Sequence, residues 1–185
     1  MREKWIVETK KGDFNGLSAK LKISPLAVRC LMNRGVESEQ EMREFLYGTL
    51  DDLHDPFLMK GMDEAVREIV KAKEQGRKVA IASDFDCDGI FSAYILWKGF
   101  QKIGLDSEIF TPDRVKEGYG LNRRIVDEAL AGGRDFLVTC DNGIAANEEV
   151  DYAKKLGMTV IVTDHHEVQE QMPNADAILA VSYTH

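Results

Sequence analysis

The chain has 185 residues, of which 44% are hydrophobic and 30% are charged, the balance of a globular chain rather than a disordered one. Its longest stretches without a charge, residues 89–97 and 177–185, hold nine residues each, far short of the ~20 that a membrane-spanning helix needs. No apolar leader opens the sequence, and its three cysteines show no paired spacing. We therefore expect a cytoplasmic protein with reduced thiols and no membrane association.

The net charge of −8 is unevenly distributed along the chain. Residues 1–80 carry 15 Lys and Arg against 14 Asp and Glu, whereas residues 81–185 carry 9 against 18. An acidic half is compatible with a solvated surface, and equally with a cation site whose bound metal offsets the charge. The positions of the carboxylates in the sequence distinguish a solvated surface from a cation site.

Residues 1–60 are predicted to form a small, mainly helical N-terminal segment. Ser24 followed by Pro25 is a typical helix start, because serine caps the free N–H groups and proline fits the first helical position. Residues 38–41 fit a capping box. Residues 50–56 are typical of a connecting loop, so we place a domain boundary near residue 60.

Residues 61–185 alternate between helical and apolar strand patterns. Helices are predicted over residues 62–75, 89–103, 122–131 and 147–156. Strands are predicted over residues 78–83, 107–111, 136–139, 159–163 and 177–181. This alternation predicts an α/β fold with a mostly parallel sheet flanked by helices on both faces, and the uniformly apolar strands suit a sheet covered on both faces.

Three of the predicted strands run directly into acidic or histidine-containing segments, at residues 84–89, 141–143 and 164–167. In an open parallel sheet the carboxyl ends of the strands line one edge, where ligands bind. Taken singly, an Asp-Asn-Gly segment is typical of a turn and a His-His pair of an exposed loop. An EF-hand loop is excluded, because a strand precedes Asp84 and the twelfth position is Ile95.

The common position of the three segments instead predicts a divalent-cation site. Several carboxylates held close together cannot all stay ionised unless cations lie among them. Oxygen ligands with one or two imidazoles suit Mn²⁺, Mg²⁺ or Zn²⁺, and the carboxylate majority favours Mn²⁺ or Mg²⁺. Asp141, alone on the middle segment, is the natural bridge between two ions. The predicted ligands are Asp86, Asp88, Asp141 and His165, with Asp84, Asp164 and His166 near by.

These three segments resemble the first three motifs of the DHH phosphoesterase superfamily, which is named for the tripeptide at 164–166. The upstream residues 23–29, 33–35, 45–46, 53–56 and 62–66 resemble the N-terminal portion of the RecJ family of exonucleases within it. The resemblance covers nearly the whole chain, up to about residue 180. It implies a DHH-type α/β catalytic domain over residues 61–185 and the degradation of single-stranded DNA from its 5′ end.

The resemblance also implies a role for each matching residue. Asp86, Asp88, Asp141 and His165 are expected to bind two Mn²⁺ or Mg²⁺ ions in the complete enzyme. The expected catalytic residues are His166, which would face the scissile phosphate, and Asp84. Arg114 and Tyr119 match the substrate-contacting loop of the family, and an arginine can bind a phosphate through two hydrogen bonds while a tyrosine can stack on a base.

Two departures from the family pattern lead to further expectations. The family has a fourth metal-binding aspartate and a second lobe, and neither is found before residue 185. We therefore expect an N-terminal fragment whose catalytic domain is incomplete at its C-terminus and which is weak or inactive alone. The alternatives are a phosphoesterase for short oligonucleotides, cyclic dinucleotides or pyrophosphate, and a non-catalytic truncated module. Single-stranded DNA and DNA-repair proteins are the expected partners, and the oligomeric state stays open.

Overall fold

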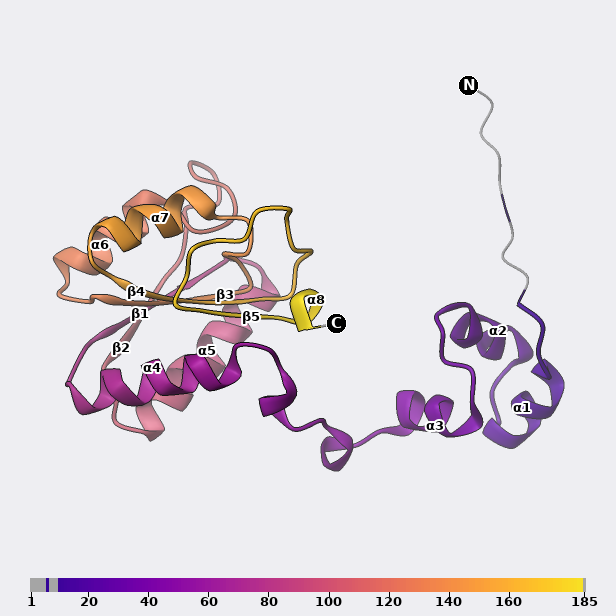
Figure 1. Cartoon of the computed structure of the whole chain (residues 1–185). Coiled ribbons are helices and arrows are strands. Elements are labelled where there is room, and N and C mark those ends of the chain that lie inside the picture. The colour runs from indigo at the N-terminus through magenta and orange to yellow at the C-terminus, as the bar shows by residue number, and fades with distance from the viewer. Residues whose placement is uncertain (1–5, 7–9, 185) are drawn as a thin grey trace, which may run out of the picture. The chain divides into compact units, whose positions relative to one another are not determined.

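The computed structural model describes residues 6 and 10–184, which fall into two compact units (Figure 1). One unit ends at His54, and the other runs over Asp55–His185. Each unit has its own hydrophobic core.

The N-terminal unit consists of short helices, as predicted. They are α1 (Phe14–Leu21), α2 (Pro25–Asn33), α3 (Glu39–Tyr47) and the single turn η1 (Leu50–Asp52). Both predicted caps are present: Ser24 accepts a hydrogen bond from the N–H of Ala27, and Ser38 forms a capping box with Glu41. The helices bury a small core around Val28, Leu31 and Met42.

The second unit is built on a five-stranded sheet in which every pairing is parallel. Its strands are β1 (Val79–Ser83), β2 (Ser107–Phe110), β3 (Phe136–Cys140), β4 (Thr159–Asp164) and β5 (Ala177–Ala180), in the spatial order β2-β1-β3-β4-β5. Its helices are η2 (Pro56–Leu58), α4 (Met62–Glu74), α5 (Cys87–Lys102), α6 (Arg123–Ala131), α7 (Asn147–Lys155) and α8 (Val181–Thr184). This confirms the predicted α/β class.

Helices cover both faces of the sheet (Figure 1). Helices α4 and α5 pack on one face and α6 and α7 on the other, each pair enclosing an apolar cluster with the strands. The strands β1 and β3 are buried along their whole length, as uniformly apolar strands require. The edge strand β2 is an exception, because Glu108 and Ile109 are exposed there.

Most predicted element ends agree with the structure to within one residue, and two differences change the type or start of an element. The strand β5 ends at Ala180, and Val181 instead begins the short helix α8. Helix α5 begins at Cys87, two residues before the predicted start at Gly89, because the carboxylate of Asp86 caps it by accepting a hydrogen bond from the N–H of Gly89. This second difference matters for the site, because it places Asp88 in the first turn of a helix.

The strand order creates a crevice between β1 and β3. The chain leaves β1 to form β2 on one side of it and then returns to form β3 on the other. Helices that cross over in opposite directions leave an opening at the carboxyl ends of such neighbouring strands, and ligands bind there in open α/β sheets. Among the described residues, no helix is long and apolar enough to cross a membrane.

Candidate metal centre

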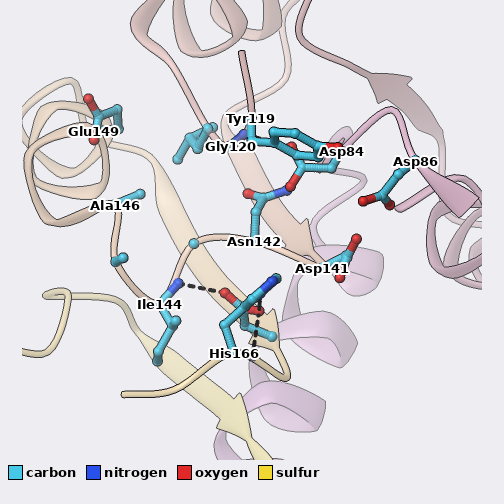
Figure 2. A pocket seen from close by; sticks show the side chains of 14 residues that line it. Asp84, Asp86, Tyr119, Gly120, Asp141, Asn142, Ile144, Ala146, Glu149 and His166 are labelled. Atoms are coloured by element: carbon cyan, nitrogen blue, oxygen red, sulfur yellow. Dashed lines mark hydrogen bonds and ion pairs between the residues drawn. The ribbon is translucent and has the colours of Figure 1, made fainter. Parts of the chain in front are cut away.

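Three strand ends bring their polar side chains together at this crevice (Figure 2). Asp84 and Asp86 follow β1, Asp141 follows β3, and His166 follows β4. One possible ligand atom from each of Asp141, His165 and His166 lies within 4.8 Å of the other two. The predicted convergence of separate chain segments on one edge of the sheet is therefore present.

Among Asp141, His165 and His166, Asp141 is by far the most enclosed, with 6% of its side chain exposed. Its Oδ1 lies 2.8 Å from Nε2 of His165. Burial raises the pKa of Asp141, the contact with His165 opposes that rise, and the nearby carboxylate of Asp86 adds to it. Two carboxylates and an imidazole in this arrangement suit a divalent cation, because adjacent ligands of an ion at ~2.1 Å are about 3 Å apart.

Asp164 engages both histidines of the site. Its side chain is 2% exposed, and its Oδ2 accepts a hydrogen bond from the N–H of Ile144 at 2.9 Å (Figure 2). Its Oδ1 accepts from the N–H of His165 at 2.7 Å and lies 2.7 Å from Nδ1 of His166. The same carboxylate raises the pKa of the His166 imidazole. Carboxylates that orient histidines in this way are typical of metal sites, and the sequence had indicated only that Asp164 lies near by.

Asp86 and Asp88 diverge because they lie on either side of the start of α5. Asp86 is the capping residue and Asp88 lies in the first turn. The start of the helix lies very close to the backbone that follows β1, since a Cβ at Gly89 would clash with the carbonyl oxygen of Asp84. Neither Asp86 nor Asp88 belongs to the group of three within 4.8 Å that the described residues form.

Two hollows meet at Asp141 and Asp164. The first, here called the acidic hollow, has a volume of about 460 Å³ (Figure 2). Its polar lining includes Asp84, Asp86, Tyr119, Asn142, Glu149 and His166. The second, here called the methionine groove, has Asp88, Ser92, Thr163 and His165 in its polar lining. Its apolar lining consists of Met59, Met62, Leu96 and Leu179. Asp86 and Asp88 thus line different hollows on the two sides of Asp141.

Asp84 is buried at the end of β1 and holds a loop by a hydrogen bond. It is 4% exposed, and its Oδ1 accepts a hydrogen bond from the N–H of Gly120 at 2.6 Å. Burial raises the pKa of Asp84, and the bond from Gly120 opposes the rise. Gly120 belongs to the loop after β2 that carries the two predicted substrate contacts, so Asp84 connects this loop to the end of β1.

The predicted substrate contacts pack around Phe85. The ring of Tyr119 lies 4.3 Å from that of Phe85 between centroids, and the guanidinium carbon of Arg114 lies 5.4 Å from the same ring. Tyr119 lines the acidic hollow, whereas Arg114 is exposed beside it and is not one of its lining residues. No sequence signal marks Phe85 as functional, because an aromatic residue between two aspartates fits an ordinary packing role equally well.

Asn142 is a further polar residue of the site, and the sequence pattern does not predict a role for it. It is 6% exposed, and its Nδ2 donates to the carbonyl oxygens of Cys140 at 3.0 Å and of Ala82 at 3.3 Å. These bonds hold the turn after β3 against β1 and so help to fix Asp141. An Asp-Asn-Gly segment is usually a simple turn, and only the burial of this one distinguishes it.

Residues 78–185 match the family model described as "DHH family, N-terminal domain". The chain belongs to the DHH family. The match begins just before β1 and contains the three strand ends that form the site. It confirms the resemblance that the sequence motifs carry.

Curated relatives in the DHH family are similar over most of this chain. The chain is 37% identical over 177 residues to the "Single-stranded-DNA-specific exonuclease RecJ" of Bacillus subtilis, covering 95% of this chain and 22% of that protein. It is 37% identical over 158 residues to the RecJ of Salmonella typhimurium, covering 85% of this chain and 27% of that protein. The chain thus spans about a quarter of the length of these relatives.

Two solved structures share the fold. A RecJ exonuclease bound to manganese matches 66% of this chain and 31% of its own, with 34% identity and a TM-score of 0.61. RecJ from Thermus thermophilus in complex with Mn²⁺ matches 92% of this chain and 23% of its own, with 27% identity and a TM-score of 0.67. In both proteins the fold therefore occurs together with manganese.

Proposed function

We propose that this chain provides the metal-dependent phosphodiesterase site of an exonuclease that degrades single-stranded DNA from its 5′ end. The observation that carries the proposal is the contact between Asp141 and His165 at the carboxyl edge of the sheet, with Asp86 and Asp88 on either side. The substrate and the direction of degradation are inferred from the RecJ relatives. We place this activity in the cytoplasm and expect DNA-repair proteins as partners.

The proposed metal ligands are Asp86, Asp88, Asp141 and His165, with Mn²⁺ or Mg²⁺ as the ions. The manganese-bound relatives support Mn²⁺, and the oxygen-rich donor set suits either ion. Divalent ions at such a site stabilise negative charge on the phosphoryl oxygens and lower the pKa of bound water. Burial of Asp141 beside Asp86 supports the assignment, because a cation relieves the repulsion between their carboxylates.

His166 is proposed to hold the scissile phosphate. Asp164 engages Nδ1 of the imidazole and favours its protonated form, in which Nε2 also carries a proton and can donate to a phosphate oxygen. A cationic imidazole is a suitable partner for phosphate, since charge-assisted hydrogen bonds are about twice as strong as neutral ones. His166 thus binds and orients the phosphate while Asp164 keeps the ring in place.

Arg114 and Tyr119 are proposed to bind the nucleotide chain through the loop that Asp84 anchors. Both side chains are exposed and pack against Phe85. Arg114 can pair with a backbone phosphate, and the ring of Tyr119 can stack on a base. We propose that Asp84 positions these residues through its bond to Gly120, rather than by contacting the reacting atoms.

Calorimetric titration with Mn²⁺ tests the metal assignment. The unmodified chain should bind Mn²⁺, and Asp141→Asn should weaken the affinity by at least tenfold. Asp135→Asn is the matched control, because Asp135 lies at the opposite end of β3 and pairs with Arg77. An unchanged affinity in Asp141→Asn would contradict the assignment.

An assay on substrates of two lengths tests the reaction. A single strand labelled at its 5′ end and a dinucleotide are incubated side by side with Mn²⁺ and the chain, for which we expect weak activity. Mononucleotides released first from the 5′ end of the long strand would support the proposal. Hydrolysis of the dinucleotide alone would instead favour a phosphoesterase for small substrates, and metal binding without hydrolysis of either would favour a non-catalytic module.

A further inference from the structure

The apolar residues of the methionine groove lie beside the proposed metal ligands and have no role in the function proposed above. Leu179 of β5 is 7% exposed, and Met59, Met62 and Leu96 are half-buried around it. Leu179 belongs to the apolar cluster beneath α4 and α5, and the other three pack against that cluster. The groove is thus a firm apolar surface that adjoins Asp141.

The lining of the groove combines two kinds of chemistry. Asp88, Asp141 and His165 are proposed metal ligands, whereas Met59, Met62, Leu96 and Leu179 present thioether and aliphatic groups. A phosphate is repelled by the carboxylates unless a cation lies between them, so the anionic part of a ligand has its place beside the metal ligands. The apolar residues then suit an uncharged, flat part of the same ligand, and polarisable methionine sulfur contacts aromatic rings favourably.

Both hydroxyl groups of the groove already donate a hydrogen bond. The hydroxyl of Ser92 donates to the carbonyl oxygen of Asp88, and the hydroxyl of Thr163 donates to the carbonyl oxygen of Thr139 at 2.7 Å. Neither hydroxyl therefore has a hydrogen left to donate to the edge of a base. Contact area with the apolar residues is then the main attraction that the groove offers to an aromatic ring, and this attraction is similar for all four bases.

We infer that the methionine groove is a base-binding subsite, which holds the nucleobase of the nucleotide next to the phosphate at the metal centre and accepts all four bases. This inference rests on the proposed function, because the phosphate has to be at the metal centre. The two hollows that meet at Asp141 and Asp164 give a phosphodiester one space on each side of the scissile phosphate. The alternative is that the base binds in the acidic hollow, against the ring of Tyr119.

The test compares two probes that differ only in the base: thymidine 5′-monophosphate and 2-deoxyribose 5-phosphate, each titrated into the chain with Mn²⁺. Neither probe contains a phosphodiester, so hydrolysis does not interfere. The nucleotide should bind about tenfold more tightly than the sugar phosphate, because its base buries apolar area against the groove. The three other deoxynucleoside monophosphates should bind within about threefold of thymidine monophosphate.

Variants locate the preference for the base. Leu96→Gln and Met62→Gln should each remove most of the tenfold preference while leaving the affinity for the sugar phosphate unchanged. Ile95→Gln is the matched control, because Ile95 is the neighbouring residue on α5, is 69% exposed and does not line the groove. Leu96→Met keeps an apolar side chain and should keep the preference, which separates loss of the surface from loss of the fold.

Equal affinities of the unmodified chain for the two probes would overturn the subsite while leaving the metal site intact. A preference that survives both glutamine variants and disappears in Tyr119→Leu would also overturn it, by placing the base in the acidic hollow. Failure of both probes to bind in the presence of Mn²⁺ would refute the proposed function itself, and the subsite with it.

Discussion

Oδ1 of Asp141 lies 2.8 Å from Nε2 of His165, although the two residues follow different strands. Asp141 has a φ of 62°, a left-handed conformation that Asp and Asn adopt more readily than other non-glycine residues. Asp141→Asn should therefore leave the backbone conformation unchanged. It removes a negative charge that is unfavourable at this position, because Asp141 is buried and lies near the carboxylate of Asp86. Without Mn²⁺ we expect this variant to match the unmodified chain in free energy of unfolding to within about 1 kcal/mol.

Addition of Mn²⁺ should separate the two proteins. At 100 times its dissociation constant, an ion that binds only the folded chain stabilises it by about 2.7 kcal/mol, or roughly 5–10 °C in Tm. Thermal unfolding followed by circular dichroism should show this increase for the unmodified chain and little of it for Asp141→Asn. Equal increases in Tm for both proteins would exclude Asp141 as a main ligand.

Asp164→Asn is predicted to destabilise the fold and to change the titration of His166. The buried carboxylate accepts hydrogen bonds from the N–H groups of Ile144 and His165, and an amide cannot accept on its NH₂ side. We expect a loss of about 2–4 kcal/mol, measured by urea unfolding. Asp127→Asn on the surface of α6 is the control, and a loss below about 1 kcal/mol in Asp164→Asn would contradict the expected role.

The pKa of His166 should fall towards its usual value of 6.5 when Asp164 is replaced, because the carboxylate raises it. The stabilisation that this pair gives is complete below about pH 6.5 and is lost as the pH rises through the raised pKa of the folded state. Because the side chain of His166 is 60% exposed, solvent reduces the effect. Titration of the ring by NMR in both proteins measures the change directly.

Two glycines of α5 are predicted to respond to alanine in opposite directions. At Gly89 a Cβ would come within 2.4 Å of the carbonyl oxygen of Asp84, so the helix start and the end of β1 must separate. Gly89→Ala should cost about 1–3 kcal/mol and weaken Mn²⁺ binding. At Gly99 nothing lies within 4 Å, so Gly99→Ala should gain up to about 1 kcal/mol from helix propensity. Similar urea midpoints for both variants would show that the close approach at Gly89 is unimportant.

The pattern of the sequence predicts the sheet and the edge where the site forms, because buried parallel strands are continuous apolar runs and their carboxyl ends must lie together. It does not predict the divergence of Asp86 and Asp88. That divergence depends on whether the carboxylate of Asp86 caps α5, which moves the helix start by two residues. Tertiary contacts decide whether Asp88 lies in a loop or in a helical turn. The contact that matters here is the close approach of Gly89 to the backbone of Asp84.

The sequence pattern does not predict the methionine groove either. Met59 and Met62 lie around the start of α4, and Leu96 and Leu179 lie on α5 and β5. Each has the apolar character of an ordinary core residue, and nothing in local periodicity indicates that these four line one groove beside Asp141. Asp164 illustrates the same limit, because its several hydrogen bonds come from backbone N–H groups that have no sequence signature.

The loop that carries Arg114 and Tyr119 is held by an ion pair whose contribution to stability should depend on pH. Glu117 contacts Nε of Arg124 at 2.6 Å and accepts from the N–H of Asp113 at 2.6 Å. The Arg124 guanidinium and the Asp113 N–H together lower the pKa of Glu117 from 4.5 to about 2. Because the pKa is lower in the folded state, this stabilisation is present above about pH 4.5 and is lost as the pH falls towards 2.

Glu117→Gln should therefore be less stable than the unmodified chain at pH 7, and the difference should shrink steadily between about pH 4.5 and pH 2. Urea unfolding at pH 7, 4.5 and 3 measures the difference in free energy at each step. Glu148→Gln is the control: the side chain of Glu148 is 85% exposed and 3.9 Å from Arg123, so its replacement should matter little at any of these pH values. A difference for Glu117→Gln that stays constant from pH 7 to 3 would mean that packing of the loop, and not the charge of Glu117, accounts for the effect.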